Sequence, residues 1–207
     1  MTNQAHWDAV YGARAEQDLT WFEDRPDLSL ELIAAFGDPT GAVIDIGAGT
    51  SRLVDHLLTD GYADVSVLDL SQAAVDLARN RLGEDGEKVH WIAADITRWR
   101  ARRRYRVWHD RAVFHFLTEE KDRAAYVTAM KGALEPGGHG IIFSFAEDGP
   151  ERCSGLPVVR YTAESLAEEL EQHAPGAFKP TEARRFTHVT PKGNQQRFQV
   201  SVFRKLA

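Results

Sequence analysis

The segment whose residue types and spacing best suit chemistry is Val43–Ser51, with the sequence VIDIGAGTS. A short apolar run carries Asp45 near its end and is followed by Gly47 and Gly49. Glycines one residue apart allow the backbone to approach a ligand closely, and a helix beginning after them offers unpaired N–H groups. Helix-compatible sequence follows over residues 52–58. The segment therefore predicts a buried parallel strand that turns tightly into a helix beside a ligand.

Two further apolar runs end in acidic residues, as the first one does. Asp69 ends the run that begins at Val65, and Asp95 follows the run over residues 90–94. A carboxylate at the tip of the second strand can accept hydrogen bonds from both hydroxyl groups of a ribose. A lone Gly-x-Gly turn is structural about as often as functional. Three strands that end in acids, separated by helix-length segments, favour one half of a doubly wound sheet that binds a nucleoside.

A cluster of ionisable residues follows a fourth apolar run, which we predict as a strand over residues 105–108. His109, Asp110 and His115 are candidates for accepting a proton, and Arg111 could orient an anionic ligand. The alternative is a structural Asp110–Arg111 pair with a packed His115, because ion pairs after a strand also fix loops. Both interpretations stay open at this point.

Periodicity, capping residues and turn residues predict the remaining elements. The connection over residues 146–160, which contains Cys153, is long enough to be a lid or a binding loop. Predicted N-caps are Ser71, Thr118 and Thr162, and the linker over residues 190–194 predicts an antiparallel hairpin. Helices are expected over 3–18, 28–36, 51–60, 72–82, 119–134 and 162–173. Strands are expected over 42–46, 64–68, 89–93, 105–108, 139–145, 182–189 and 195–204.

Composition narrows the class of protein. A chain of 207 residues with 43% apolar and 27% charged residues is expected to form one globular domain. Apolar runs fall far short of the roughly 20 residues that span a bilayer, and the N-terminus is unlike a signal peptide, so we expect no membrane partner. A single cysteine, Cys153, fits a reducing cytoplasm.

The net charge of −6 argues against a nucleic-acid partner, and the arginine-rich stretch over residues 98–106 is interpreted as a solvated loop. Scattered histidines and one cysteine predict no metal site. The chain is expected to be a monomer or a homodimer.

Taken together, these features resemble the class I S-adenosylmethionine-dependent methyltransferases over about residues 40–204. The resemblance rests on the turn at Asp45–Gly49, on Asp69 and Asp95, on the Leu-x-Pro-Gly-Gly turn over 134–138 and on the terminal hairpin. It implies an α/β fold: a doubly wound, mostly parallel seven-stranded sheet with an antiparallel C-terminal hairpin and helices on both faces. Residues 1–40 would form an N-terminal helical cap on a methyltransferase domain of residues 41–207.

Two positions differ from the glycine motifs of related nucleotide-binding folds. Ser51 stands where the methyltransferase family often has a further glycine. A NAD-binding Rossmann oxidoreductase would need the glycine that Arg52 replaces. S-adenosylmethionine has no phosphate, so a less open turn suffices for it.

The resemblance also implies S-adenosylmethionine as cofactor and assigns its site. The backbone around Gly47 and Gly49 would face the methionine half, Asp69 would hold the ribose, and Asp95 with Ile96 would read the adenine. The expected cofactor-binding residues are Tyr11, Trp21, Asp45, Gly47, Ala48, Gly49, Ser51, Asp69, Leu70, Asp95, Ile96 and Asp110. The expected catalytic residues are His109, Asp110, Arg111 and His115, close to the methyl group and its acceptor.

Three hypotheses about function follow from the resemblance. The first is methyl transfer to a small molecule through a thiol, amine, hydroxyl or carboxyl group, in a deep pocket with aromatic walls formed by Trp21, Trp108, Phe114 and Phe116. The segment Trp7-Asp8-x-x-Tyr11, which resembles small methyltransferases of this kind, favours it. The second is a protein lysine methyltransferase, which needs an open acidic groove. The third is a non-catalytic S-adenosylmethionine-binding module.

Overall fold

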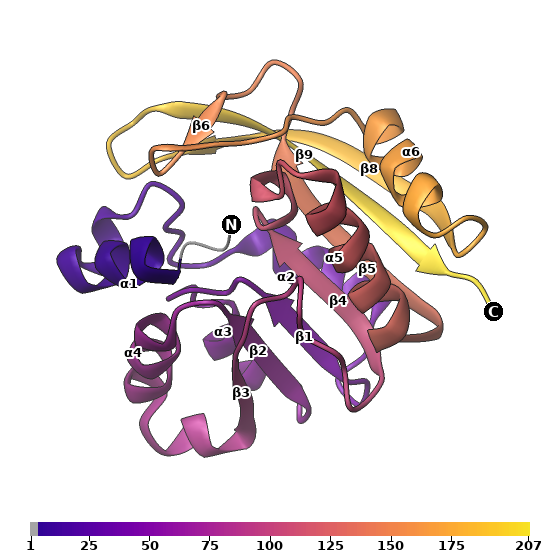
Figure 1. The fold of residues 1–207 in the computed structure, drawn as a ribbon. Helices are drawn as coiled ribbons and strands as arrows, with labels where there is room; N and C mark the ends of the chain where they lie inside the picture. The colour runs from indigo at the N-terminus through magenta and orange to yellow at the C-terminus, as the bar shows by residue number, and fades with distance from the viewer. Residues whose placement is uncertain (1–3) are drawn as a thin grey trace.

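The computed structural model describes residues 4–207 and is built around one seven-stranded sheet with the order β3-β2-β1-β4-β5-β9-β8 (Figure 1). Strands β1 to β5 pair in parallel, and β9 runs antiparallel to both β5 and β8. The predicted fold class is therefore confirmed. The strands are β1 Val43–Ile46, β2 Val65–Asp69, β3 Val89–Ala93, β4 Tyr105–Arg111, β5 Leu134–Phe145, β8 Phe178–Val189 and β9 Gln195–Lys205.

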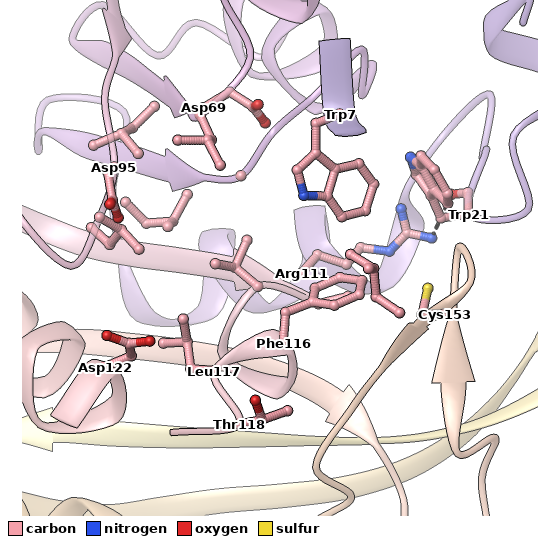
Figure 2. A pocket seen from close by; sticks show the side chains of 18 of the residues that line it. Trp7, Trp21, Asp69, Asp95, Arg111, Phe116, Leu117, Thr118, Asp122 and Cys153 are labelled. Carbon is pink, nitrogen blue, oxygen red and sulfur yellow. Dashed lines mark hydrogen bonds between the residues drawn. The ribbon is translucent and has the colours of Figure 1, made fainter. Parts of the chain in front are cut away.

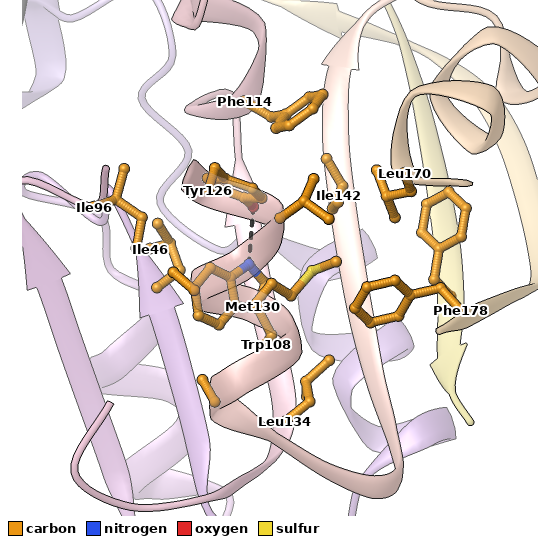
Figure 3. Close-up of a cluster of buried hydrophobic side chains, with 14 of the residues drawn as sticks. Ile46, Ile96, Trp108, Phe114, Tyr126, Met130, Leu134, Ile142, Leu170 and Phe178 are labelled. Atoms are coloured by element: carbon orange, nitrogen blue, oxygen red, sulfur yellow. Dashed lines mark hydrogen bonds between the residues drawn. The ribbon is translucent and has the colours of Figure 1, made fainter. Parts of the chain in front are cut away.

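Helices cover both faces of this sheet, since neighbouring strand residues point to opposite sides. Ile46 and Trp108 pack with helices α5 and α6 (Figure 3), whereas Val43 and Val107 pack with α2 and α3. The helices are α1 Gln4–Ala13, α2 Asp27–Phe36, α3 Leu53–Thr59, α4 Gln72–Leu82, α5 Glu120–Ala133 and α6 Ala163–His173. Three short 3-10 turns are Glu16–Asp18, Gly83–Lys88 and Phe114–Phe116.

Strand β4 is longer than predicted. Residues 109–111 pair with Ile141, Ile142 and Phe143 of β5, so the prediction that they form a turn after the strand is wrong. Alternation along the strand then sends His109 toward α2 and Asp110 toward α5. The chain turns only at Ala112, which adopts a left-handed φ of 77° that non-glycine residues rarely adopt.

Two of the three predicted N-caps are confirmed. The Ser71 hydroxyl accepts from the Ala74 N–H, and Thr162 forms a reciprocal capping box with Ser165. Thr118 is not a cap, because α5 begins one residue later, after Glu119.

Segment boundaries differ elsewhere. The predicted first helix ends early, at Ala13, and its first residue, residue 3, lies outside the described residues. The connection over 146–160 contains two short antiparallel strands, β6 Arg152–Cys153 and β7 Leu156–Pro157. In the part of the chain that the structure describes, no helix has the length and apolar character to cross a membrane.

Acidic residues anchor the N-terminal segment to the body of the protein. Asp8 accepts from the Ser71 hydroxyl at 2.5 Å, and Glu16 pairs with Arg52 and Arg81 at 2.5 and 2.9 Å. This segment lies over α4 and the ends of the strands. The boundary of a separate cap at residue 40 stays a prediction, and α2, which falls inside it, packs on the sheet.

Candidate active site

A cavity of about 280 Å³ lies at the carboxyl ends of β1, β2 and β4 (Figure 2). Ligands of open α/β sheets bind at this edge, where the strand order reverses. Its walls come from the N-terminal segment, the strand ends, the start of α5, the β6–β7 hairpin and β9. The lining residues are Trp7, Tyr11, Trp21, Ile46, Gly47, Leu68, Asp69, Leu70, Ala94, Asp95, Ile96, Arg111, Ala112, Val113, Phe116, Leu117, Thr118, Asp122, Cys153, Leu156, Pro157, Gln196 and Phe198.

The turn after β1 needs both of its glycines. Gly47 and Gly49 have φ angles of 63° and 56°. A Cβ atom on Gly47 would lie 1.9 Å from Cγ2 of Val113, and one on Gly49 would lie 2.1 Å from the Tyr11 hydroxyl oxygen. Only glycine therefore lets the neighbouring walls of the cavity come this close to the turn.

Gly47→Ala should lower the free energy of unfolding by more than Gly61→Ala does. Both glycines have positive φ, so both substitutions cost about 1–2 kcal/mol for the left-handed backbone. Only Gly47 also has a side chain in the way, whereas Gly61 faces open space. Chemical denaturation of both variants measures the difference, and equal losses would show that Val113 gives way without cost.

Two of the predicted acids lie on the cavity wall, held by backbone groups. Asp69 accepts from the N–H of Gly49 at 2.7 Å and from that of Ser71 at 2.8 Å. Burial raises the pKa of Asp69 to about 6, against the effect of those two bonds. Asp95 accepts from the N–H and the hydroxyl of Thr97 at 2.9 and 2.7 Å. Leu70 and Ile96 line the cavity beside them.

Asp45 and His109 are brought together, but away from the cavity wall. The Asp45 carboxylate and His109 Nδ1 are 2.7 Å apart, and His109 Nε2 is 3.0 Å from the Ser29 hydroxyl on α2. Both side chains are buried beneath the glycine turn. Ala48 and Ser51 do not line the cavity either, and the Ser51 hydroxyl accepts from the Leu53 N–H at the start of α3.

Asp110 is fully buried and bonded within the protein. Its carboxylate accepts from the N–H groups of Val113 and Phe114 at 2.7 and 3.0 Å and from the Tyr126 hydroxyl at 2.6 Å. Burial raises its pKa to about 6. It therefore fixes the turn that follows β4, and it does not itself line the cavity.

His115 is also buried off the cavity, with Nδ1 accepting from the Phe145 N–H at 3.3 Å. Burial lowers its pKa to about 3, so the ring is neutral. Of the four residues expected to be catalytic, Arg111 alone lines the cavity.

Aromatic rings form the wall beside Arg111. Trp7 meets Phe116 edge to face at 5.2 Å and Trp21 at 5.9 Å, and Tyr11 meets Trp21 at 6.3 Å. Trp7 thus packs against these rings and also lines the cavity. Of the four aromatic walls predicted, Trp21 and Phe116 are present, while Trp108 and Phe114 are buried in the core.

A family model described as a methyltransferase domain matches residues 43–138, which include the glycine turn, both acids and β4. Residues 43–138 therefore form a methyltransferase domain, and the chain has the fold of the class I S-adenosylmethionine-dependent methyltransferases. The cofactor of this methyltransferase domain is S-adenosylmethionine, and the glycine turn that a Cβ would fill, with two acids on the wall, suits an adenosyl group.

Solved methyltransferase structures share this fold. A structure described under the conversion of a disulfide bond into a thioacetal group during echinomycin biosynthesis superimposes with a TM-score of 0.77 at 22% identity, covering 98% of this chain and 93% of that one. The 1,6-didemethyltoxoflavin-N1-methyltransferase of Burkholderia thailandensis, solved with 1,6-didemethyltoxoflavin and S-adenosylhomocysteine, gives a TM-score of 0.68 at 24% identity, covering 96% and 81%.

One relative identified by sequence is named as a lysine methyltransferase. EEF1A lysine methyltransferase 2 of Danio rerio is 28% identical over 110 residues, which cover 50% of this chain and 47% of the relative. The chain thus spans about half the length of this relative. Among residues 4–207, no group of three histidine, cysteine or acidic residues is placed to bind a metal ion.

Proposed function

We propose that this protein transfers the methyl group of S-adenosylmethionine to a small-molecule acceptor. The cofactor supplies a methyl carbon already activated by its sulfonium. The protein's part is then to align the acceptor atom with that carbon and to keep water out. Gly47, Gly49, Asp69, Leu70, Asp95 and Ile96 are proposed to hold the cofactor, with Tyr11 and Trp21 closing over it.

The residues at the end of the cavity away from Asp69 and Asp95 support this proposal. Trp7, Trp21 and Phe116 line this end, together with Cys153 and Leu156 of the β6–β7 hairpin. This wall is mainly apolar and contains the cation Arg111 (Figure 2). Such a site suits a compact molecule with an apolar body.

The ionisable groups beside this wall are poor proton acceptors. Burial raises the pKa of Tyr11 well above its ordinary value and that of Cys153 to about 11, so both are neutral at pH 7. His109, Asp110 and His115 do not line the cavity. We infer that the acceptor atom is one that needs little help from a base, such as a thiolate sulfur or an unprotonated ring nitrogen. The chemistry named for the two structural neighbours, at a disulfide and at a ring position N1, agrees with this inference.

Protein lysine methylation is the second candidate, because two curated relatives are named as lysine methyltransferases. A lysine side chain is a cation before it is methylated, and Arg111 at this end of the cavity would repel it. The acidic groove that a lysine acceptor needs is absent from the lining that the described residues form there.

Transfer of a labelled methyl group tests the proposal. The protein is incubated with labelled S-adenosylmethionine and panels of thiols, amines, phenols and carboxylates, and separately with a cell lysate. We expect S-adenosylhomocysteine to form with a small molecule, and the label to enter the organic extract. Label found only in precipitated protein would reject the small-molecule function in favour of the lysine one.

A further inference from the structure

The two ends of the cavity differ in charge. Asp69 and Asp95 lie at the end assigned to the cofactor, and Asp122 lies on the same side of Figure 2. Arg111 lies toward Trp21 and Cys153, across the cavity from these acids. The acidic end suits a cofactor with a positively charged sulfonium, whereas the end beside Arg111 suits a ligand of the opposite charge.

Part of the Arg111 guanidinium has no partner in the protein. Its side chain is 14% exposed, and its Nη2 donates to the Trp21 carbonyl at 2.9 Å and lies 3.1 Å from Glu23. A guanidinium has five N–H groups, of which Nη2 carries two. Within residues 4–207, no acceptor is bonded to the N–H groups of Nε and Nη1. Donors that open onto a cavity take an acceptor from water or from a ligand.

A buried histidine on β8 contacts the same glutamate as Arg111. His188, 4% exposed, has Nδ1 2.9 Å from the Glu23 carboxylate and Nε2 2.8 Å from the Thr20 carbonyl. Both ring nitrogens of His188 are thus engaged, and the Glu23 carboxylate that His188 contacts lies in turn 3.1 Å from Nη2 of Arg111.

Glu23 is ionised in this arrangement. Burial alone would raise its pKa, but the hydrogen bond with His188 and the charge of Arg111 outweigh burial and lower it. The same three residues join the N-terminal segment, β4 and β8, so the cation is held in place rather than free to move into solvent.

We propose that the acceptor of this methyltransferase is a small aromatic molecule with a carboxylate, bound by Nε and Nη1 of Arg111. This inference rests on the proposed small-molecule function and adds a class of substrate to it. Trp7, Trp21 and Phe116 contact the aromatic body, and the carboxylate is fixed by charge-assisted hydrogen bonds. His188 and Glu23 are positioning residues that hold Arg111 toward the cavity.

Calorimetry on the protein saturated with S-adenosylhomocysteine tests the charge preference without turnover. The two probes are 4-(methylthio)benzoate and 4-(methylthio)benzamide, which differ only in the charged group. We expect the carboxylate to bind at least about tenfold more tightly, the effect of one charge-assisted hydrogen bond. Equal affinities, tighter binding of the amide, or no binding of either probe would overturn the proposal.

Variants assign the preference to a residue. Arg111→Gln should reduce the ratio of the two affinities to about one, and Arg111→Lys, which keeps the charge, should retain part of it. Arg185→Gln, which removes an exposed arginine of β8 outside the cavity, is the matched control and should keep the full ratio. A ratio that survives Arg111→Gln would overturn the assignment.

A transfer assay separates the failure of this inference from that of the proposed function. It compares 4-mercaptobenzoate with 4-mercaptobenzamide in the presence of S-adenosylmethionine. Methylation of the amide as fast as the acid rejects the anionic acceptor but leaves a small-molecule methyltransferase. Tight binding of the benzoate probe with label entering only protein rejects the proposed function and leaves the anion site standing.

Discussion

Asp69→Ala should weaken the binding of S-adenosylmethionine by about 1–3 kcal/mol, the range for lost hydrogen bonds to a charged group. The carboxylate has two roles in the proposed site. It would accept from the ribose hydroxyl groups, and it accepts from the N–H groups of Gly49 and Ser71, which shapes the glycine turn. Calorimetric titration with S-adenosylmethionine measures the loss. Asp76→Ala is the control. It removes an exposed acid from α4, the helix that follows Asp69, and should bind S-adenosylmethionine normally.

The pH dependence of the same binding distinguishes a carboxylate from a merely structural residue. Because burial raises the pKa of Asp69 to about 6, this side chain is largely protonated at pH 5 and largely ionised at pH 7. The ionised form accepts hydrogen bonds at both oxygens, so the affinity for S-adenosylhomocysteine should rise between these two pH values. In Asp69→Asn the rise should be smaller.

Asp110 is the necessary reference for that experiment, because burial also raises its pKa to about 6. Its titration is present in both proteins, so the difference between the two pH profiles belongs to Asp69. Identical profiles in the wild type and in Asp69→Asn would remove Asp69 from the ribose site and leave it as a support for the turn.

The cofactor half of the cavity could be predicted because its information is local in the chain. A strand, a glycine turn and a helix cap are each encoded within about ten residues, and Asp69 and Ser71 lie where the sequence put them. Acids at the ends of parallel strands meet at one edge by topology alone. The cofactor half therefore needed no knowledge of long-range packing.

The acceptor half could not be predicted in the same way. Strand β4 has an apolar run that stops at Trp108, yet pairing with β5 extends it by three residues, and this decides on which side each ionisable side chain lies. His109 therefore bonds to Asp45 and Ser29, away from the cavity. The sequence contains no signal for this, since charged residues in a strand interior read as a turn.

Two other features were hidden for a different reason: one wall of the cavity and the support of Arg111. The strands of the β6–β7 hairpin are two residues each, too short for any periodicity, although they bring Cys153 into the cavity wall. His188 lies 165 residues from Glu23 in the chain, and only the folded hairpin brings them together. A buried histidine between two acceptors is recognised from geometry and not from composition.

Asp110→Ala should lower the free energy of unfolding by about 3–5 kcal/mol, the cost of removing one partner from a buried charged network. Two backbone N–H groups and the Tyr126 hydroxyl would lose their acceptor in a site closed to water. The sequence made Asp110 a candidate for accepting a proton, and the loss of such a residue would lower turnover more than cofactor affinity. The observed bonds predict instead that stability and cofactor affinity fall together, because the turn they hold carries Ala112 and Val113 of the cavity wall.

Two further variants decide between these roles. Asp110→Asn offers one acceptor oxygen and one amide donor to three donors, so it should be destabilised almost as much as the alanine variant. Tyr126→Phe removes one of the three bonds and also leaves the buried Trp108 N–H without its acceptor, so it should cost about 1–3 kcal/mol. Urea denaturation and titration with S-adenosylhomocysteine measure both quantities. An Asp110→Asn protein with unchanged stability and cofactor affinity but slow methyl transfer would contradict this structural role. It would support a role for Asp110 in the reaction.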